Sequence, residues 1–111
     1  MEEDAENALS PDWKPVEGGR TVGMHGTEGG VILRDEEHGA GARITLEHPG
    51  ALGAYAVTCG VYGFFVHTAY AADEAEGRRK YDAMREQLVE IMSLPDTDEA
   101  TARVDAFVKA F

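Results

Sequence analysis

The residues of this sequence best suited to nucleophilic chemistry are its single cysteine, Cys59, and its four histidines. Cys59 could attack a substrate if His67 or His48 served as its base, because the thiolate is the reactive form and a neighbouring base lowers the thiol pKa. Cys59 and His67 fall on two apolar segments, residues 54–59 and 64–71, which we expect to pair as antiparallel strands. Whether they form a dyad depends on the register of that pair.

The connection between these two segments reads Gly-Val-Tyr-Gly, with glycines where a tight turn favours them. A two-residue turn centred on Val61 and Tyr62 places Ala56 opposite His67 and leaves Cys59 on the other face of the sheet. We therefore predict that no Cys-His dyad forms, and we interpret Cys59 as a small buried hydrophobe. No catalytic residue is assigned.

Aromatic and hydroxyl side chains gather around one imidazole in residues 60–70. Tyrosine offers apolar area with a polar tip, and neutral histidine can both donate and accept a hydrogen bond. These side chains either line a ligand cleft or form hydrogen bonds within the core or across a subunit boundary. The candidate ligand-binding residues are Tyr62, His67 and Tyr70, with Cys59 beside them.

Motifs for metal and phosphate binding are missing from the sequence. The histidines and the cysteine form no HxH, HExxH or CxxC pattern, and the acidic run at residues 35–37 lacks the DxDxDG spacing of a calcium loop. We interpret that run as charges that keep a strand end soluble. The glycines of residues 23–30 lack the lysine of a phosphate loop, so we interpret them as a flexible lead-in to a strand. We expect no metal and no cofactor.

An excess of acidic side chains limits the partners of the protein. The sequence has 21 acidic and 10 basic residues, which gives a formal net charge of -11. Such a field repels phosphate backbones and anionic lipids. The dense basic cluster at residues 78–80 is flanked by acids on the same predicted helix. We expect neither a nucleic-acid partner nor a membrane partner.

The cysteine content and the apolar segments predict the compartment. One cysteine excludes an intramolecular disulfide, as is typical of a reducing compartment. The first residues are acidic, whereas a secretory signal begins with basic residues and continues with an apolar stretch. No segment has the length and apolarity of a membrane span. We therefore expect a soluble cytoplasmic protein.

The chain of 111 residues has the size of one domain. Residues 1–19 combine acids, Ser-Pro, Lys-Pro and Gly-Gly with few large apolar groups. We interpret them as an acidic N-terminal arm that is either flexible or docked through Trp13. We expect residues 20–111 to form a single α+β domain.

Alternating apolar residues and turn signals predict a meander of strands in the first part of that domain. The expected strands are residues 31–37, 42–48, 54–59 and 64–71, and a short edge strand at residues 21–24 would make a fifth. The fold class is therefore α+β, with a four- or five-stranded antiparallel meander sheet followed by two C-terminal helices.

Two helices follow the strands, and at least one of them is expected to pack on the sheet. Asp73 and Glu76 resemble a capping pair at the start of a helix over residues 73–93, which Pro95 ends. Asp96 and Glu99 resemble a second capping pair. The expected apolar stripe of the second helix comprises Ala100, Val104, Phe107, Val108 and Phe111.

Strands 54–59 and 64–71 carry apolar side chains on both faces, so each face is expected to need a cover. If both helices lie on one face, a second copy of the chain would cover the other. We therefore expect a non-catalytic self-association or protein-interaction module, with a homodimer as the expected oligomer or a protein as the partner. The alternative is a small-ligand-binding domain or a small enzyme with a cleft near Tyr62, His67 and Tyr70.

Overall fold

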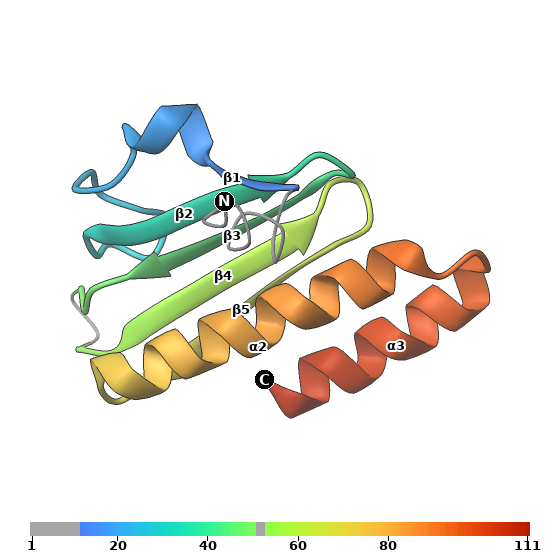
Figure 1. The fold of residues 1–111 in the computed structure, drawn as a ribbon. Coiled ribbons are helices and arrows are strands. Elements are labelled where there is room, and N and C mark those ends of the chain that lie inside the picture. The colour runs from blue at the N-terminus through green and yellow to red at the C-terminus, as the bar shows by residue number, and fades with distance from the viewer. Residues whose placement is uncertain (1–11, 51–52) are drawn as a thin grey trace, which may run out of the picture.

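The computed structural model describes residues 12–50 and 53–111, and the first part of the predicted arm, residues 1–11, lies outside the described residues. The chain forms one antiparallel sheet followed by two helices, which confirms the predicted α+β class (Figure 1). The elements are β1 (Trp13–Pro15), a short 3-10 helix η1 (Val16–Gly19), β2 (Ile32–His38), β3 (Ala42–Glu47), β4 (Tyr55–Val61), β5 (Phe65–Ala71), α2 (Glu74–Ser93) and α3 (Thr97–Ala110).

The five strands follow one another in space in the order of the sequence, from β1 to β5. The fifth strand is β1 at residues 13–15, and residues 21–24, where we predicted it, form turns instead. Trp13 lies opposite His38 on β2, and its indole meets the imidazole edge to face at 5.1 Å. The indole is buried in the core, so burial of this large apolar side chain ties β1 to the sheet.

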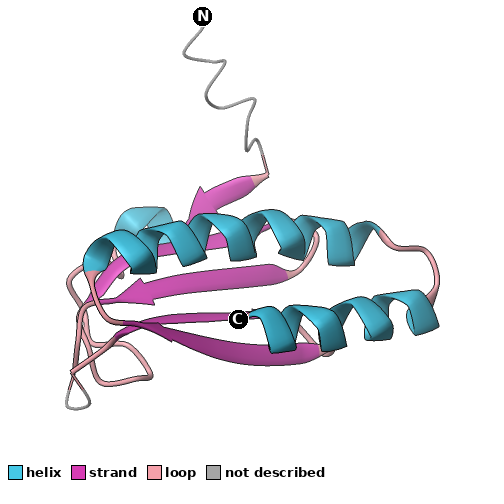
Figure 2. Cartoon of the chain, turned by 90° about the horizontal axis from the view of Figure 1, so that it is seen from below, coloured by secondary structure: helices cyan, strands magenta, loops and turns pink. Residues whose placement is uncertain are grey.

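Both helices lie on the same face of the sheet, side by side (Figures 1 and 2). Helix α2 packs chiefly on β4 and also contacts β3 and β5, whereas α3 packs against α2. The core lies between the helices and the strands because alternate strand residues point toward α2. Its main members are Ala42, Ile44, Leu46, Val57, Cys59, Ala69, Tyr81, Met84, Leu88, Ile91 and Phe107.

The helix starts follow the predicted capping signals. Asp73 caps α2 by accepting a hydrogen bond from the Glu76 amide at 2.8 Å. Asp96 caps α3, but its partner is the amide of Asp98 at 2.7 Å. The predicted stripe of α3 includes one error, because Val108 is exposed while Phe107 is buried.

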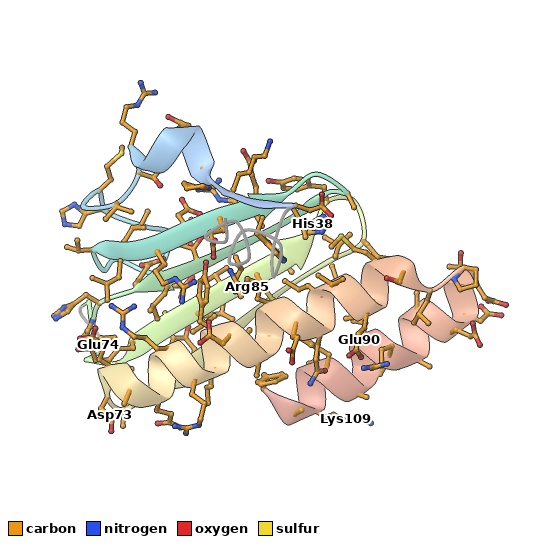
Figure 3. All side chains as sticks on the ribbon, in the orientation of Figure 1. His38, Asp73, Glu74, Arg85, Glu90 and Lys109 are labelled. Carbon is orange, nitrogen blue, oxygen red and sulfur yellow. The ribbon has the colours of Figure 1, made fainter. Side chains whose placement is uncertain are left out.

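The face of α2 nearest β2 carries a polar cluster. Glu36 on β2 accepts hydrogen bonds from Tyr81 at 2.6 Å and from Arg85 at 2.9 Å (Figure 3 labels Arg85). Burial first, and then the hydrogen bond to Glu36, raises the pKa of Tyr81. Glu90, also labelled in Figure 3, pairs with Arg103 of α3, which links the two helices.

The β4–β5 connection differs from the predicted two-residue turn. Val61 pairs with Phe65, which leaves three residues between the strands. Gly63 takes a φ of +77° and the Phe64 amide donates to the Val61 carbonyl at 2.9 Å. A positive φ at the third residue of a four-residue turn is a conformation that favours glycine. The turn therefore uses Gly63 alone and moves the register, which changes the partners of every residue on β5.

Candidate functional site

The face of the sheet turned away from α2 and α3, which we call the helix-free face, carries more polar side chains than we predicted. Cross-strand pairing places Thr45, Thr58 and Thr68 on it in one row. The hydroxyls of Thr58 and Thr68 lie 3.2 Å apart, within hydrogen-bond distance. The expectation that both faces of the β4–β5 pair are apolar is therefore wrong for the centre of this face, and these polar groups need no second apolar layer above them.

A β-bulge on β2 brings one more apolar side chain to the helix-free face. Ile32 pairs with Glu47 and Arg34 pairs with Leu46, so Leu33 is the extra residue. Because of the bulge, Ile32 and Arg34 lie on opposite faces, although strict alternation would place them together. Ile32 is buried in the helix-free face.

A pocket of about 730 Å³ hollows the helix-free face. Its floor includes Thr45, Thr58 and Gly60, its walls are formed by residues 25–27 on one side and residues 62–64 on the other, and Arg43, Glu47, Ile32 and Val66 also line it. Ligand pockets in proteins typically have volumes of about 300–1,000 Å³, mostly apolar walls and a few convergent polar groups. The pocket on the helix-free face has these properties.

Arg43 is the charged group most firmly held at this pocket. Its Nε and Nη2 atoms donate to the two carboxylate oxygens of Asp35 at 3.0 and 2.7 Å. Thr45 donates to the same carboxylate at 2.9 Å. The hydrogen bond to Asp35 raises the pKa of Arg43. The Asp35 side chain is fully buried, whereas 42% of the Arg43 side chain is exposed, so the pair presents its guanidinium and hides its carboxylate.

Glu47 holds the loop that forms one wall of the pocket. Its carboxylate is buried and accepts hydrogen bonds from the backbone amides of Glu28 at 3.2 Å and Gly30 at 3.0 Å. Backbone donors of this kind stabilise a buried carboxylate. Glu28 in turn accepts a hydrogen bond from Tyr70 on β5 at 2.9 Å. The segment predicted as a flexible lead-in is therefore fastened to both β3 and β5.

The structure separates the four predicted site residues. Tyr62 lies at the pocket, and 63% of its surface is exposed. Tyr70 lies on the same face but outside the pocket lining, where its hydroxyl bonds to Glu28, and this bond raises its pKa. Cys59 and His67 point to the other face, because their register partners belong to the core under α2 and α3. Of these four residues, Tyr62 and Cys59 border the pocket, but the side chain of Cys59 belongs to the core on the other face.

Cys59 and His67 are direct cross-strand neighbours, so the predicted register that separated them is wrong. Burial nevertheless raises the pKa of the Cys59 thiol to about 12, so the thiol is protonated at neutral pH. The His67 ring lies 5.9 Å from the ring of Phe107, and its Nε2 is buried without a hydrogen-bond partner among the described residues. Cys59 is therefore adjacent to a half-buried histidine but is itself closed to substrate, and the interpretation of Cys59 as a buried hydrophobe agrees with its position in the core.

Sequence reasoning missed the Arg43–Asp35 pair. The alternation in residues 42–47 predicted that Arg43 and Thr45 share a face, but it did not predict which loop would cover that face. The acidic run 35–37 was interpreted as strand-end charge, whereas Asp35 is buried, Glu36 contacts α2 and only Glu37 is exposed. The signal that could have found the pair was Asp35 at a strand position that faces Thr45 across a hairpin.

Within residues 12–50 and 53–111, no three histidine, cysteine or carboxylate side chains gather as metal ligands would. The helices in the described part of the chain are all too short or too polar to cross a membrane. Comparison with protein-family models, with curated proteins and with solved structures finds no match. The basis for a function is therefore the geometry of the pocket itself.

Proposed function

We propose that the protein is a non-catalytic binding domain whose pocket on the helix-free face takes up a small, largely apolar ligand. The observation that carries this proposal is the pocket of about 730 Å³, with its apolar rim and its few fixed polar groups. A pre-formed pocket of this kind is a common starting point for ligand recognition. The proposal keeps the ligand-binding alternative from the sequence but moves it to other residues.

The state of the polar groups supports binding over catalysis. The carboxylates of Asp35 and Glu47 are both occupied, one by Arg43 and Thr45 and the other by backbone amides. Groups held in this way can orient a ligand, but a general base needs an oxygen or nitrogen within reach of a substrate proton. The buried thiol of Cys59 faces the core.

The test is binding of a neutral apolar dye, Nile red, measured by its fluorescence and by amide chemical-shift changes in the full chain. Thr58→Phe should fill the pocket floor and weaken binding about tenfold or more, because a bulky side chain occupies the ligand volume. Thr68→Phe is the matched control, since Thr68 pairs with Thr58 on the same face but does not line the pocket. Shift changes outside the helix-free face, or equal binding by both variants, would contradict the proposal.

A second candidate function is self-association, which the exposed edge strand β5 favours. Strand β5 is an edge of the sheet within the described residues, and Val66 on it is 77% exposed. Exposed apolar edge strands pair readily with other strands. We propose a homodimer through β5, or pairing of β5 with a strand of a protein partner in a cytoplasmic setting, as the alternative use of this surface.

Light scattering distinguishes the two candidates. A dimer that Val66→Lys converts to a monomer would support self-association, because a charge on the exposed edge opposes pairing. A stable monomer at low micromolar concentration would count against it. The equivalent change at the exposed Val108 of α3 is the control.

A further inference from the structure

We infer that the ligand of this pocket is an uncharged amphipathic molecule with a carbonyl oxygen, which Arg43 binds, and an apolar body. The inference rests on the proposed function, because it names the chemistry of the ligand for the same pocket. Three features support it: the N–H groups of Arg43 that are not bonded to Asp35, the carboxylates near Arg43, and the bare backbone of the pocket floor beside Arg43.

Arg43 is a pre-organised donor. A guanidinium has five N–H groups, and the Asp35 carboxylate accepts from one on Nε and one on Nη2. The remaining three have no acceptor among the side chains and backbone that the structure describes. Because Asp35 is buried and also bonded to Thr45, the guanidinium is held in place before a ligand arrives. An acceptor oxygen can therefore bind with little ordering cost.

The local charges disfavour an anionic ligand. The positive charge of Arg43 is already balanced by Asp35 at 2.7 Å. The carboxylate of Glu47 lines the same pocket, and Glu37 lies near enough to raise the pKa of Arg43. A ligand carboxylate would bring one more negative charge into this group and would lose its hydration. The net charge of -11 on the whole chain adds to this repulsion at long range.

The available hydrogen-bonding groups disfavour a cationic ligand. An ammonium group has only donors, so it needs acceptor oxygens. Glu47 is the carboxylate on the pocket wall, but it is 1% exposed and its oxygens accept from Glu28 and Gly30. Of the arginine and carboxylate side chains that line the pocket, the exposed one is the donor Arg43, and the exposed polar groups of His25, Thr27 and Tyr62 carry no carboxylate with which an ammonium group could pair. An uncharged carbonyl therefore matches the pocket better than either ion.

The floor beside Arg43 suits an apolar body. Gly60 lies opposite Arg43 on β4, and a Cβ there would come within 2.6 Å of the Phe65 carbonyl oxygen. The floor at this point is therefore bare backbone, which a ligand can approach closely. Val66 and Phe64 expose apolar surface at the rim, so a chain or ring that leaves Arg43 passes over Gly60 toward these side chains.

The experiment compares matched probes on the full chain by calorimetry and amide chemical shifts. The probes are octanamide, octanoate, octylamine and the neutral 1-chlorooctane, which differ only in the polar end. We expect the affinity for octanamide, taken relative to that for 1-chlorooctane, to be about tenfold higher in the native chain than in a chain without the Arg43 guanidinium, as a net hydrogen bond to a charged donor would allow. Octanoate and octylamine should bind more weakly than octanamide.

The Arg43 variants test the assigned residue. Arg43→Met should remove this preference, so that the ratio of the octanamide affinity to the 1-chlorooctane affinity falls about tenfold. Because Arg43→Met strands a buried carboxylate, the double variant Asp35→Leu with Arg43→Leu provides the same test without an unpaired charge. Loss of the amide preference in the double variant supports the inference.

Two sets of results would contradict the proposals. Tighter binding of octanoate or octylamine than of octanamide, or an amide preference that persists in the double variant, overturns the inference and leaves the pocket proposal standing. Failure of all four probes and of Nile red to bind overturns both.

Discussion

The two faces of this sheet have similar strands but different chemistry, because helices cover only one of them. On the covered face, Cys59 and His67 are adjacent, yet Cys59 lies in the core, the His67 ring lies near Phe107 of α3, and the thiol stays protonated at neutral pH. On the helix-free face, Arg43 is fixed by a buried carboxylate and remains accessible. The comparison shows that in this fold the cover above a residue decides its reactivity more than its neighbours across the strands do.

The two faces also treat their buried polar groups differently. Asp35 and Glu47 on the helix-free face are each satisfied by several donors. His67 on the covered face keeps a buried Nε2 without a partner in the described chain. An unsatisfied buried polar atom costs about 1–3 kcal/mol. Around His67 the covered face therefore relies on apolar packing, with the hydrogen bonds that Glu36 accepts from Tyr81 and Arg85 at its β2 side, whereas the centre of the helix-free face is held by hydrogen bonds.

The largest loss of stability is expected from a substitution on the covered face. Phe107→Ala removes a ring that contacts Phe65 and His67 at centroid distances of 5.7 and 5.9 Å. It should lower the free energy of unfolding by about 3–5 kcal/mol, as other large-to-small changes at buried aromatic positions do. Urea unfolding measures this, with Val108→Ala as the exposed control on the same helix. Equal effects of the two changes would contradict the described packing of α3.

The next effect is expected from the ion pair on the helix-free face. Arg43→Met leaves the buried Asp35 without its cation and should destabilise the protein by about 2 kcal/mol, less than for a fully buried pair because Arg43 is partly exposed. Arg20→Met breaks an exposed pair with Glu17 and should change stability by less than about 0.5 kcal/mol. Denaturant unfolding of both variants decides whether Asp35 is as buried as described.

A similar or smaller loss of stability is expected from a substitution in the wall of the pocket. A Cβ at Gly30 would collide with the backbone carbonyl oxygen of His48, so Gly30→Ala should cost about 1–3 kcal/mol and displace the wall. Gly39→Ala is the control, because nothing lies near its added Cβ. Thermal melts measure the cost, and Nile red binding should fall for Gly30→Ala only. If Gly30→Ala left the melting temperature unchanged, the loop would not be fastened over the sheet.

The smallest effect on stability at neutral pH concerns the buried thiol, whose contribution changes only at high pH. The Cys59 pKa is raised by burial from 9.0 to about 12 in the folded protein. A thiol reagent at pH 8 should therefore label the folded chain far more slowly than the urea-unfolded chain. Because the unfolded thiol ionises first, the free energy of unfolding should fall as the pH rises from 9.0 toward 12. Cys59→Ala should reduce that fall, and fast labelling of the folded chain would show that the helix cover over β4 opens readily.

The local elements could be predicted because their signals lie within a few residues. Asp73 with Glu76 marked the start of α2, and Asp96 with Glu99 marked the start of α3. The β2–β3 and β4–β5 hairpins followed from the apolar strand patterns and from the glycines between them. By contrast, the predicted β4–β5 register was wrong. The two glycines of the connection allowed loops of two lengths, and in the folded protein the turn has its positive φ at Gly63.

The sequence by itself determined a meander of strands followed by two amphipathic helices, since periodicity, caps and turns act locally. Only the tertiary structure decided that both helices share one face, that Trp13 adds β1 and that residues 25–30 fold back over β3. These choices depend on contacts between residues far apart in the chain, such as Glu47 with Gly30 and Arg43 with Asp35. The pocket arises from these contacts, because it lies on the face without helices, between residues 25–27 and residues 62–64.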